Sequence, residues 1–301
     1  MWTVPKMSTS TLTLGGGAAI SGTATPGSSF HGLLHYYTRL WQHSLHMERT
    51  VGATLRMPFS FPDIDRFGEA LCGLLTGLKG SGTKGSGADL SDGMIQDEVK
   101  TVCLCQTWRC TACKKRTPWT HTACGHCGST ELERMDDSRF GISASAHVKD
   151  RATLRNYWCI VLDHVSGDVY KTIVWKIDAS NPYFNAYIDE QLSKGKKDHC
   201  NLLPRSYDFV LSGATRVLQV EMTLPTDTSV APTIGDLDQT ETAERLSCAV
   251  LKQAERVALG LKKTDNTTCI TVEEALRVLG PRKKAHGKAR GQTSRGIGVS
   301  Q

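Results

Sequence analysis

Four of the eleven cysteines in this chain form two closely spaced pairs. Cys110 and Cys113 make the first pair, Cys124 and Cys127 make the second, and ten residues separate the pairs. Two residues between paired thiols let a chain wrap around one cation, and a short hairpin can return the second pair to complete a tetrahedral site. The spacing therefore predicts one Zn²⁺ bound by these four cysteines. Because four protein ligands leave no open position for a substrate, we expect the site to be structural.

The sequence leaves other ligand sets open. Cys103, Cys105, His121 and His126 lie close enough along the chain to replace one of the four cysteines. A cysteine in an apolar segment, such as Cys103, commonly behaves as a small buried hydrophobic residue instead. An iron–sulfur cluster also takes four thiolates. We favour zinc, because two paired knuckles on one hairpin suit a single tetrahedral cation.

Composition restricts the class of protein and its compartment. The chain has 301 residues, of which 39% are hydrophobic, enough for one main core with extensions. No apolar run approaches the ~20 residues needed to cross a bilayer, and the N-terminus lacks the features of a signal peptide. The other cysteines show no disulfide framework, and the net charge of +6 gives only a mild bias towards polyanions. We expect an intracellular protein, with the nucleus favoured.

Changes in composition divide the chain into segments. Helical spacing of apolar residues predicts helices at 30–47, 67–78, 240–261 and 271–279, and Thr271 and Glu274 of the last one form a capping box. The expected segments are a flexible arm at 1–29, a helical N-terminal region at 30–79, a Gly/Ser-rich linker at 80–98, a main domain at 99–225, C-terminal helices at 238–280 and a basic disordered tail at 281–301.

The order of predicted elements indicates the fold of the main domain. Runs of β-forming residues predict strands at 99–108, 140–148, 157–162, 207–211 and 216–223, and a helix at 180–194 lies between the third and fourth strands. This is the order of an OB-fold barrel, here with a zinc ribbon at 108–132 inserted between the first two strands. The predicted fold class is therefore α+β: a small OB-fold-like β-barrel with an inserted four-cysteine zinc ribbon, flanked by helices and disordered termini.

Part of this domain resembles a known family. The segments Trp108 to Lys115, Cys124 to Gly128, Arg139 to Asp150 and Tyr157 to Leu162 resemble the zinc-ribbon OB domain at the C-terminal end of the large subunit of replication protein A. The resemblance covers about residues 100–223. It departs from the family where Cys103-Leu104-Cys105 occupies the expected first strand and where the turn at 151–156 lacks the usual Thr-Gly pair. The resemblance implies that single-stranded nucleic acid binds in the barrel groove, zinc holds the ribbon, and a helix after the barrel packs against partner subunits.

Aromatic and basic residues alternate along the same region. OB grooves stack bases on aromatic rings, worth ~1–3 kcal/mol per base, while Lys and Arg follow the phosphates. We expect single-stranded DNA or RNA as the partner, protein subunits at the 240–261 helix, no membrane and no small-molecule substrate. The candidate nucleic-acid-binding residues are Trp108, Arg109, Lys114, Lys115, Arg116, Trp119, Arg139, Phe140, Arg155, Tyr157, Lys196 and Lys197.

These observations lead to a non-catalytic hypothesis. The carboxylates show no motif with catalytic spacing that we identify, so we predict no catalytic residue and a protein that is not an enzyme. The leading hypothesis is a zinc-stabilised, single-stranded nucleic-acid-binding protein of DNA replication, DNA repair, telomeres or RNA handling. Two alternatives remain: a protein-interaction scaffold that assembles through its C-terminal helices, and a viral nonstructural nucleic-acid-binding protein. The sequence does not choose between DNA and RNA.

Overall fold

The structure is a computed structural model that describes most of the chain. The described residues are 30–52, 63–80, 88–104, 107–118, 121–135, 138–195, 200–247, 253–261 and 268–279. Several predictions lie outside them, namely the arm at 1–29, the tail at 281–301, residues 81–87 of the linker, and the candidate residues Cys105, Trp119, Lys196 and Lys197. Within the described part, no helix is both long and apolar enough to cross a membrane.

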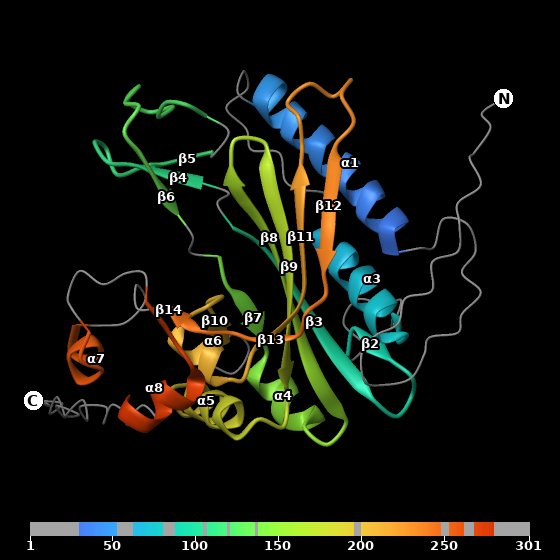
Figure 1. The fold of residues 1–301 in the computed structure, drawn as a ribbon, viewed down its shortest axis with the longest axis vertical. Coiled ribbons are helices and arrows are strands. Elements are labelled where there is room, and N and C mark those ends of the chain that lie inside the picture. The colour runs from blue at the N-terminus through green and yellow to red at the C-terminus, as the bar shows by residue number, and fades with distance from the viewer. Residues whose placement is uncertain are drawn as a thin grey trace, which may run out of the picture.

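A mixed sheet organises the fold (Figure 1). Its strands follow the order β1-β2-β3-β8-β9-β11-β12, and β13 also pairs with β11. Their bounds are β1 Lys79–Gly80, β2 Leu90–Ser91, β3 Gln96–Leu104, β8 Leu154–Ser166, β9 Val169–Asp178, β11 Thr215–Thr223, β12 Thr233–Asp238 and β13 Thr242–Ala243. Neighbouring strands are antiparallel except β3 and β8, which are parallel. A parallel pair needs a crossover connection, and this one carries β4 to β7 and α4.

Two helices cover one face of the sheet. Helix α1 (Phe30–Met47) buries Leu34, Trp41 and Leu45 at helical spacing and continues into the π-helical turn η1 (Glu48–Gly52). Helix α3 (Ile64–Thr76) begins at Asp63, whose side chain accepts a hydrogen bond from the Arg66 N–H, and ends at a left-handed glycine. Figure 1 shows both helices along the same side of the strands.

Shorter elements cover the other face and the C-terminal end. These are β7 (Phe140–Ile142), α4 (Ala144–Asp150), α5 (Pro182–Ser193), β10 (Cys200–Leu202), α6 (Tyr207–Leu211), β14 (Leu246–Ser247), α7 (Gln253–Ala258), β15 (Cys269–Ile270) and α8 (Val272–Leu279). Strand β7 pairs with β10, and β14 pairs with β15. Alternate residues of β8 join two separate cores: Trp158 and Ile160 pack with α1 and α3, whereas Tyr157 and Cys159 pack with α5. The sheet is therefore the middle of three layers.

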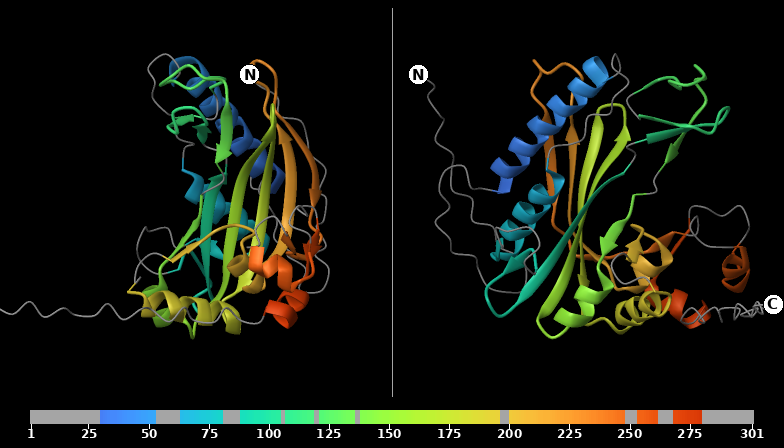
Figure 2. Two further views of the ribbon diagram at one scale, coloured as in Figure 1. Left: turned by 90° about the vertical axis from the view of Figure 1, so that its left-hand side faces the viewer. Right: turned by 180° about the vertical axis from the view of Figure 1, so that it is seen from behind.

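The four-cysteine segment folds apart from these layers. Strands β4 (Thr107–Cys110), β5 (Arg116–Pro118) and β6 (Leu132–Met135) form their own sheet in the order β5-β4-β6. Figures 1 and 2 show this small sheet projecting from the body of the protein. The Arg134 side chain connects it to β8, because it pairs with Asp163 at 2.5 Å and donates to the His164 carbonyl.

The predicted α+β class is confirmed, but the OB-fold barrel is not. The segment Tyr207–Leu211 is helix α6, not the predicted fourth strand, because Ser206 caps it by accepting from the Phe209 N–H. Strand β7 stops at Ile142, where Ser143 caps α4. The region 240–261, predicted as one helix, holds β13, β14 and α7 among its described residues. Strand β9 was not predicted, and strand β2 and the start of β3 lie inside the predicted linker.

Candidate functional site

The hairpin of β2 and β3 brings three charged residues together. Strand residues Leu90 and Ser91 pair with Asp97 and Gln96, so Asp89 lies beside the next position of β3, Glu98. Successive side chains of a strand point to opposite faces, which places Glu98 and Lys100 on one face. The register with β8 sets Glu98 beside Tyr157 and Lys100 beside Cys159. Tyr157 and Cys159 belong to the core on the side of the sheet away from α3, so Glu98 and Lys100 lie on that side too.

The three side chains are in direct contact. The Lys100 Nζ lies 2.5 Å from Glu98 Oε1 and 3.8 Å from Asp89 Oδ2. The same Asp89 oxygen accepts a hydrogen bond from the Val99 N–H at 2.8 Å, which fixes the carboxylate against the strand. Each side chain is about a quarter exposed: 27% for Asp89, 26% for Glu98 and 25% for Lys100. A backbone N–H thus holds Asp89 in place, and all three side chains keep part of their surface exposed to solvent.

The electrostatics of the cluster reflect partial burial and mutual attraction. Burial raises the pKa of Glu98 above its usual value, with Lys100 opposing that shift and Asp89 adding to it. Burial lowers the pKa of Lys100, but the Glu98 and Asp89 carboxylates outweigh it, so the net shift is upward. Two carboxylates and an ammonium on one strand pair form an arrangement that can bind a hard cation and a phosphate oxygen.

Asp97, between these residues in sequence, has a different role. Its carboxylate is fully buried on the face of α3. It accepts two hydrogen bonds from the Arg155 guanidinium, at 3.1 and 2.8 Å, and one from the Trp158 indole N–H at 2.8 Å. Both the backbone and side-chain N–H groups of Asn156 also donate to it. Asp97 therefore joins β3 to β8 and has no capacity left for a ligand.

We expect Asp97→Ala to lower the free energy of unfolding by about 3–5 kcal/mol, because it leaves donors of a buried charged network without an acceptor. Urea unfolding would measure the loss. The matched control is Asp189→Ala, which breaks the exposed pair between Asp189 and Arg151 (3.1 Å) and should cost about 1 kcal/mol or less. Equal losses for the two variants would contradict the structural role of Asp97.

The four cysteines of the ribbon form a second cluster. Their sulfur atoms all lie within 4.8 Å of one another, with Cys110 and Cys127 at 3.5 Å and Cys113 and Cys124 at 3.6 Å. The residue after each pair, Lys114 or Gly128, has a left-handed backbone, which turns each knuckle back on itself. The four predicted ligands are therefore brought together as a possible metal site.

The N–H groups of the knuckles favour thiolates. The His126 N–H points at the sulfur of Cys124 (3.4 Å) and lowers the pKa of that thiol to about 5. At Cys127 the Ser129 N–H lowers the pKa, but the adjacent Cys110 and Cys113 thiols outweigh it and raise the pKa to about 12. Four close thiols thus compete for protons, and a bound cation would let all four be thiolates.

The alternative ligands are less well placed. Cys103 is buried in the core beside α3, as predicted for a small hydrophobic residue. His126 is exposed and His121 is partly exposed, and neither joins the four-sulfur group. Cys105 lies outside the described residues.

The predicted nucleic-acid-binding residues fall into separate groups. Lys114, Lys115 and Arg116 are exposed together on the ribbon. On the same small sheet Trp108 is half-buried, and Arg109 pairs with Glu133 at 2.8 Å. Arg139 is exposed on the body of the protein, before β7.

Three other candidate residues are buried or paired within the protein. Phe140 is fully buried, and Tyr157 is buried with its hydroxyl 3.1 Å from His147, so neither ring offers a face to a base. The prediction that these two rings stack on bases is therefore wrong. Phe140 and Tyr157 lie in strands, as predicted, but both side chains are buried in the core. Arg155 is paired with Asp97, as described above.

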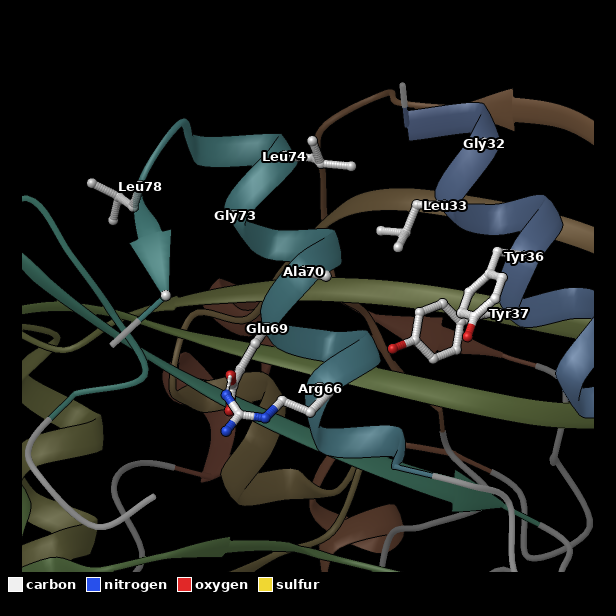
Figure 3. Close-up of a pocket in the computed structure, with 11 residues that line it drawn as sticks. Gly32, Leu33, Tyr36, Tyr37, Arg66, Glu69, Ala70, Gly73, Leu74 and Leu78 are labelled. Atoms are coloured by element: carbon white, nitrogen blue, oxygen red, sulfur yellow. Dashed lines mark hydrogen bonds and ion pairs between the residues drawn. The ribbon is translucent and has the colours of Figure 1, made fainter. Parts of the chain in front are cut away.

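A groove between α1 and α3 is a separate feature. It has a volume of about 770 Å³, and Figure 3 shows Leu33, Tyr36 and Tyr37 of α1 opposite Ala70 and Leu74 of α3. Helix α3 packs on the sheet through Gly68, where an added Cβ would lie 2.0 Å from Thr101 Oγ1. Thr101 faces away from Glu98 and Lys100, so the groove is on the other side of the sheet from the charged cluster.

Comparison with known proteins gives one family. Residues 60–209 match the family model of the MamI restriction endonuclease. The matched span contains the charged cluster, the ribbon and the parallel pair of β3 and β8. No curated protein and no solved structure matches the chain. The resemblance to replication protein A is not supported by these comparisons and stays a prediction.

The family match corrects one point of the prediction from the sequence. It names an enzyme, which contradicts our prediction that the chain is not one. Asp89, Glu98 and Lys100, which the structure brings into contact, were not among the residues predicted from the sequence. The available signal was a Glu-x-Lys spacing in a β-forming segment, which places both side chains on one face, with an aspartate shortly before it. We assigned Asp89 and Glu98 to a linker, and that assignment hid the pattern.

Proposed function

We propose that this protein is a metal-dependent endonuclease that hydrolyses phosphodiester bonds of double-stranded DNA. The observation that carries the proposal is the contact of Asp89, Glu98 and Lys100 on one hairpin, within the span that matches an endonuclease family. The exposed lysines of the ribbon support a DNA ligand. The single-stranded ligand, the closed barrel and the nuclear role that we expected from the sequence have no support of this kind.

The charged cluster fits a Mg²⁺ ion. Mg²⁺ prefers carboxylate oxygens and usually binds through one or two carboxylates together with substrate phosphate. Asp89 and Glu98 supply such oxygens, and the Lys100 ammonium already lies within 4 Å of both carboxylates. A bound Mg²⁺ would supply Lewis acidity to the phosphate and to an attacking water.

The residues of the chain have distinct parts in this reaction. Asp89 and Glu98 would hold the cation at the exposed edge of β3, and the Val99 N–H keeps Asp89 in place. Lys100 donates hydrogen bonds to a non-bridging phosphate oxygen as negative charge develops there. Water oxygen bonds to phosphorus, the bond from phosphorus to the leaving sugar oxygen breaks, and the proton of the water passes to solvent while the leaving oxygen takes one up.

We propose that the ribbon binds one Zn²⁺ through Cys110, Cys113, Cys124 and Cys127 and presents basic residues to the DNA backbone. Four thiolates within 4.8 Å suit tetrahedral zinc. Lys114 and Lys115 lie at the turn of the first knuckle, where they are exposed. Phosphate contacts of this kind fix a protein on the duplex without reading its sequence.

Replacing the knuckle lysines should weaken DNA binding without changing the metal sites. For Lys114→Gln with Lys115→Gln, the slope of log affinity against log salt should fall by about 2, or about 1 per lysine. Fluorescence anisotropy with a labelled random-sequence duplex would measure it. Lys176→Gln is the control, because Lys176 is already paired with Glu241 at 2.8 Å. An unchanged slope in the double variant would contradict the proposal that the ribbon contacts DNA.

The proposed activity has a direct test. Purified, zinc-loaded protein is incubated with plasmid and bacteriophage DNA in the presence and absence of Mg²⁺, and the products are sequenced at their ends. The proposal expects fragments with 5′ or 3′ phosphates at defined positions, only with Mg²⁺. Intact DNA over a range of protein and Mg²⁺ concentrations would contradict it.

A further inference from the structure

The turn between β2 and β3, the hairpin that carries the charged cluster, exposes an apolar side chain. Met94 is 83% exposed, the highest value among the large hydrophobic residues that the structure finds exposed in its described part. It lies between β2 and β3, in the turn that joins Asp89 to Glu98. Single exposed apolar residues are common on protein surfaces, and what distinguishes Met94 is its place in the hairpin turn close to Asp89 and Glu98.

The turn itself is well ordered by hydrogen bonds. The Asp92 carboxylate accepts from the Met94 N–H at 3.0 Å and from the Ile95 N–H at 2.8 Å. Gly93 has a φ of 95°, and its N–H donates to the Ser91 hydroxyl at 2.9 Å. These hydrogen bonds therefore hold the backbone of Met94 in one turn conformation.

The distance along the hairpin suits a contact with DNA bases. Met94 precedes Glu98 by four residues, so their backbones are at most about 13 Å apart at ~3.3 Å per extended residue. DNA rises ~3.4 Å per nucleotide along one strand, so a phosphate held at Glu98 would leave Met94 about four steps away.

From these observations we infer that Met94 is a wedge that inserts between neighbouring base pairs when the protein holds DNA at Asp89, Glu98 and Lys100. This inference rests on the proposed nuclease function. Apolar side chains, including methionine, enter base steps in proteins that kink DNA, and the methionine sulfur contacts aromatic faces favourably. The Asp92 carboxylate stays charged, but it is directed at the N–H groups of Met94 and Ile95 within the turn.

The test compares unstacking with binding in the same sample. Protein is titrated, without added Mg²⁺, into a pool of fluorescein-labelled random-sequence duplexes in which 2-aminopurine replaces adenine. Anisotropy reports binding, and 2-aminopurine emission rises when a base unstacks. For Met94→Ala at saturation we expect the rise in emission to be about half that of the wild type or less, because the base step stays stacked. Met94→Leu, which keeps an apolar side chain of similar size, should retain most of the rise.

Met47→Ala is the control, because Met47 is an exposed methionine at the end of α1. It should leave both signals unchanged. Equal emission with wild type and Met94→Ala at equal binding would overturn the wedge, even if plasmid cleavage with Mg²⁺ stands. Absence of both binding and plasmid cleavage would overturn the nuclease proposal, and the wedge with it. Thermal unfolding of each variant confirms that the hairpin is folded.

Discussion

Glu98→Gln should lower the rate of Mg²⁺-dependent DNA cleavage by about a thousandfold or more. The amide keeps the size of the side chain and an oxygen for Lys100, but it removes one of the two carboxylates that would hold the cation. Metal stabilisation of a transition state is worth several kcal/mol, and each 1.36 kcal/mol is about tenfold in rate. Single-turnover cleavage of plasmid DNA at saturating protein would measure the loss at the chemical step.

The other two members of the cluster should behave similarly for different reasons. Asp89→Asn retains an oxygen that can accept from the Val99 N–H, so the hairpin should remain folded while the charge is lost. Lys100→Met keeps an apolar stem of similar length and removes the ammonium beside Glu98. Binding of labelled DNA should persist in both variants, because the expected defect is in cleavage.

A matched pair elsewhere in the sheet provides the control. Lys171 of β9 and Glu221 of β11 form an ion pair at 3.3 Å. Glu221→Gln and Lys171→Met repeat the same chemical changes outside the hairpin and should leave the cleavage rate within about twofold, as expected for an exposed pair. Cleavage by Glu98→Gln at the wild-type rate would exclude this cluster as the active site.

Local rules predicted the elements whose limits are set by neighbouring residues. Helix α1 begins and ends where its apolar spacing predicts, at 30 and 47. The capping box of α8 is confirmed, because the Glu274 carboxylate accepts from the Thr271 N–H at 2.7 Å and the Thr271 hydroxyl accepts from the Glu274 N–H at 3.2 Å. These signals lie within a few residues of each other, so the sequence alone carries them.

Tertiary contacts decided the elements that were predicted wrongly. Leu246 has helical neighbours in sequence, yet it forms a strand with Ile270 and is buried with Val210 of α6. Strand β9 is buried on both faces over most of its length, so it lacks the clean alternation of a half-exposed strand. The parallel pairing of β3 with β8 spans the whole ribbon, and no local pattern specifies it.

The same distinction applies to the two sites. The cysteine cluster could be predicted because paired thiols at fixed spacing are rare and suggest one geometry. The charged cluster consists of common residue types, and its meaning depends on the hairpin that places Asp89 beside Glu98. When only the sequence is known and the strand register is not, a Glu-x-Lys sequence is most simply interpreted as part of a solvent-exposed segment.

Removing the ribbon cysteines should strongly weaken DNA binding while most of the protein stays folded. Purified protein should contain one zinc per chain by elemental analysis, and Cys110→Ser with Cys124→Ser should contain none. Among the described residues of the ribbon, only Cys110, Thr117 and Cys124 are buried, so this small sheet has no apolar core to fold around without a metal. Limited proteolysis should then cut the double variant within 107–135, and anisotropy should show a loss of duplex affinity of at least about tenfold, given the salt-dependent contacts assigned to the ribbon.

The control for this experiment is Cys269→Ser, which changes an exposed cysteine of β15 outside the cluster and should retain zinc and DNA affinity. Urea unfolding should give nearly the same main transition for all three proteins, because the two cores on either side of the large sheet contain no residue of the ribbon. If the purified protein contained iron and absorbed visible light, the site would be assigned as an iron–sulfur cluster instead of a zinc site. Wild-type duplex affinity in the metal-free double variant would contradict the assigned role of the ribbon, and Mg²⁺-dependent cleavage would then depend on the β2 and β3 hairpin alone.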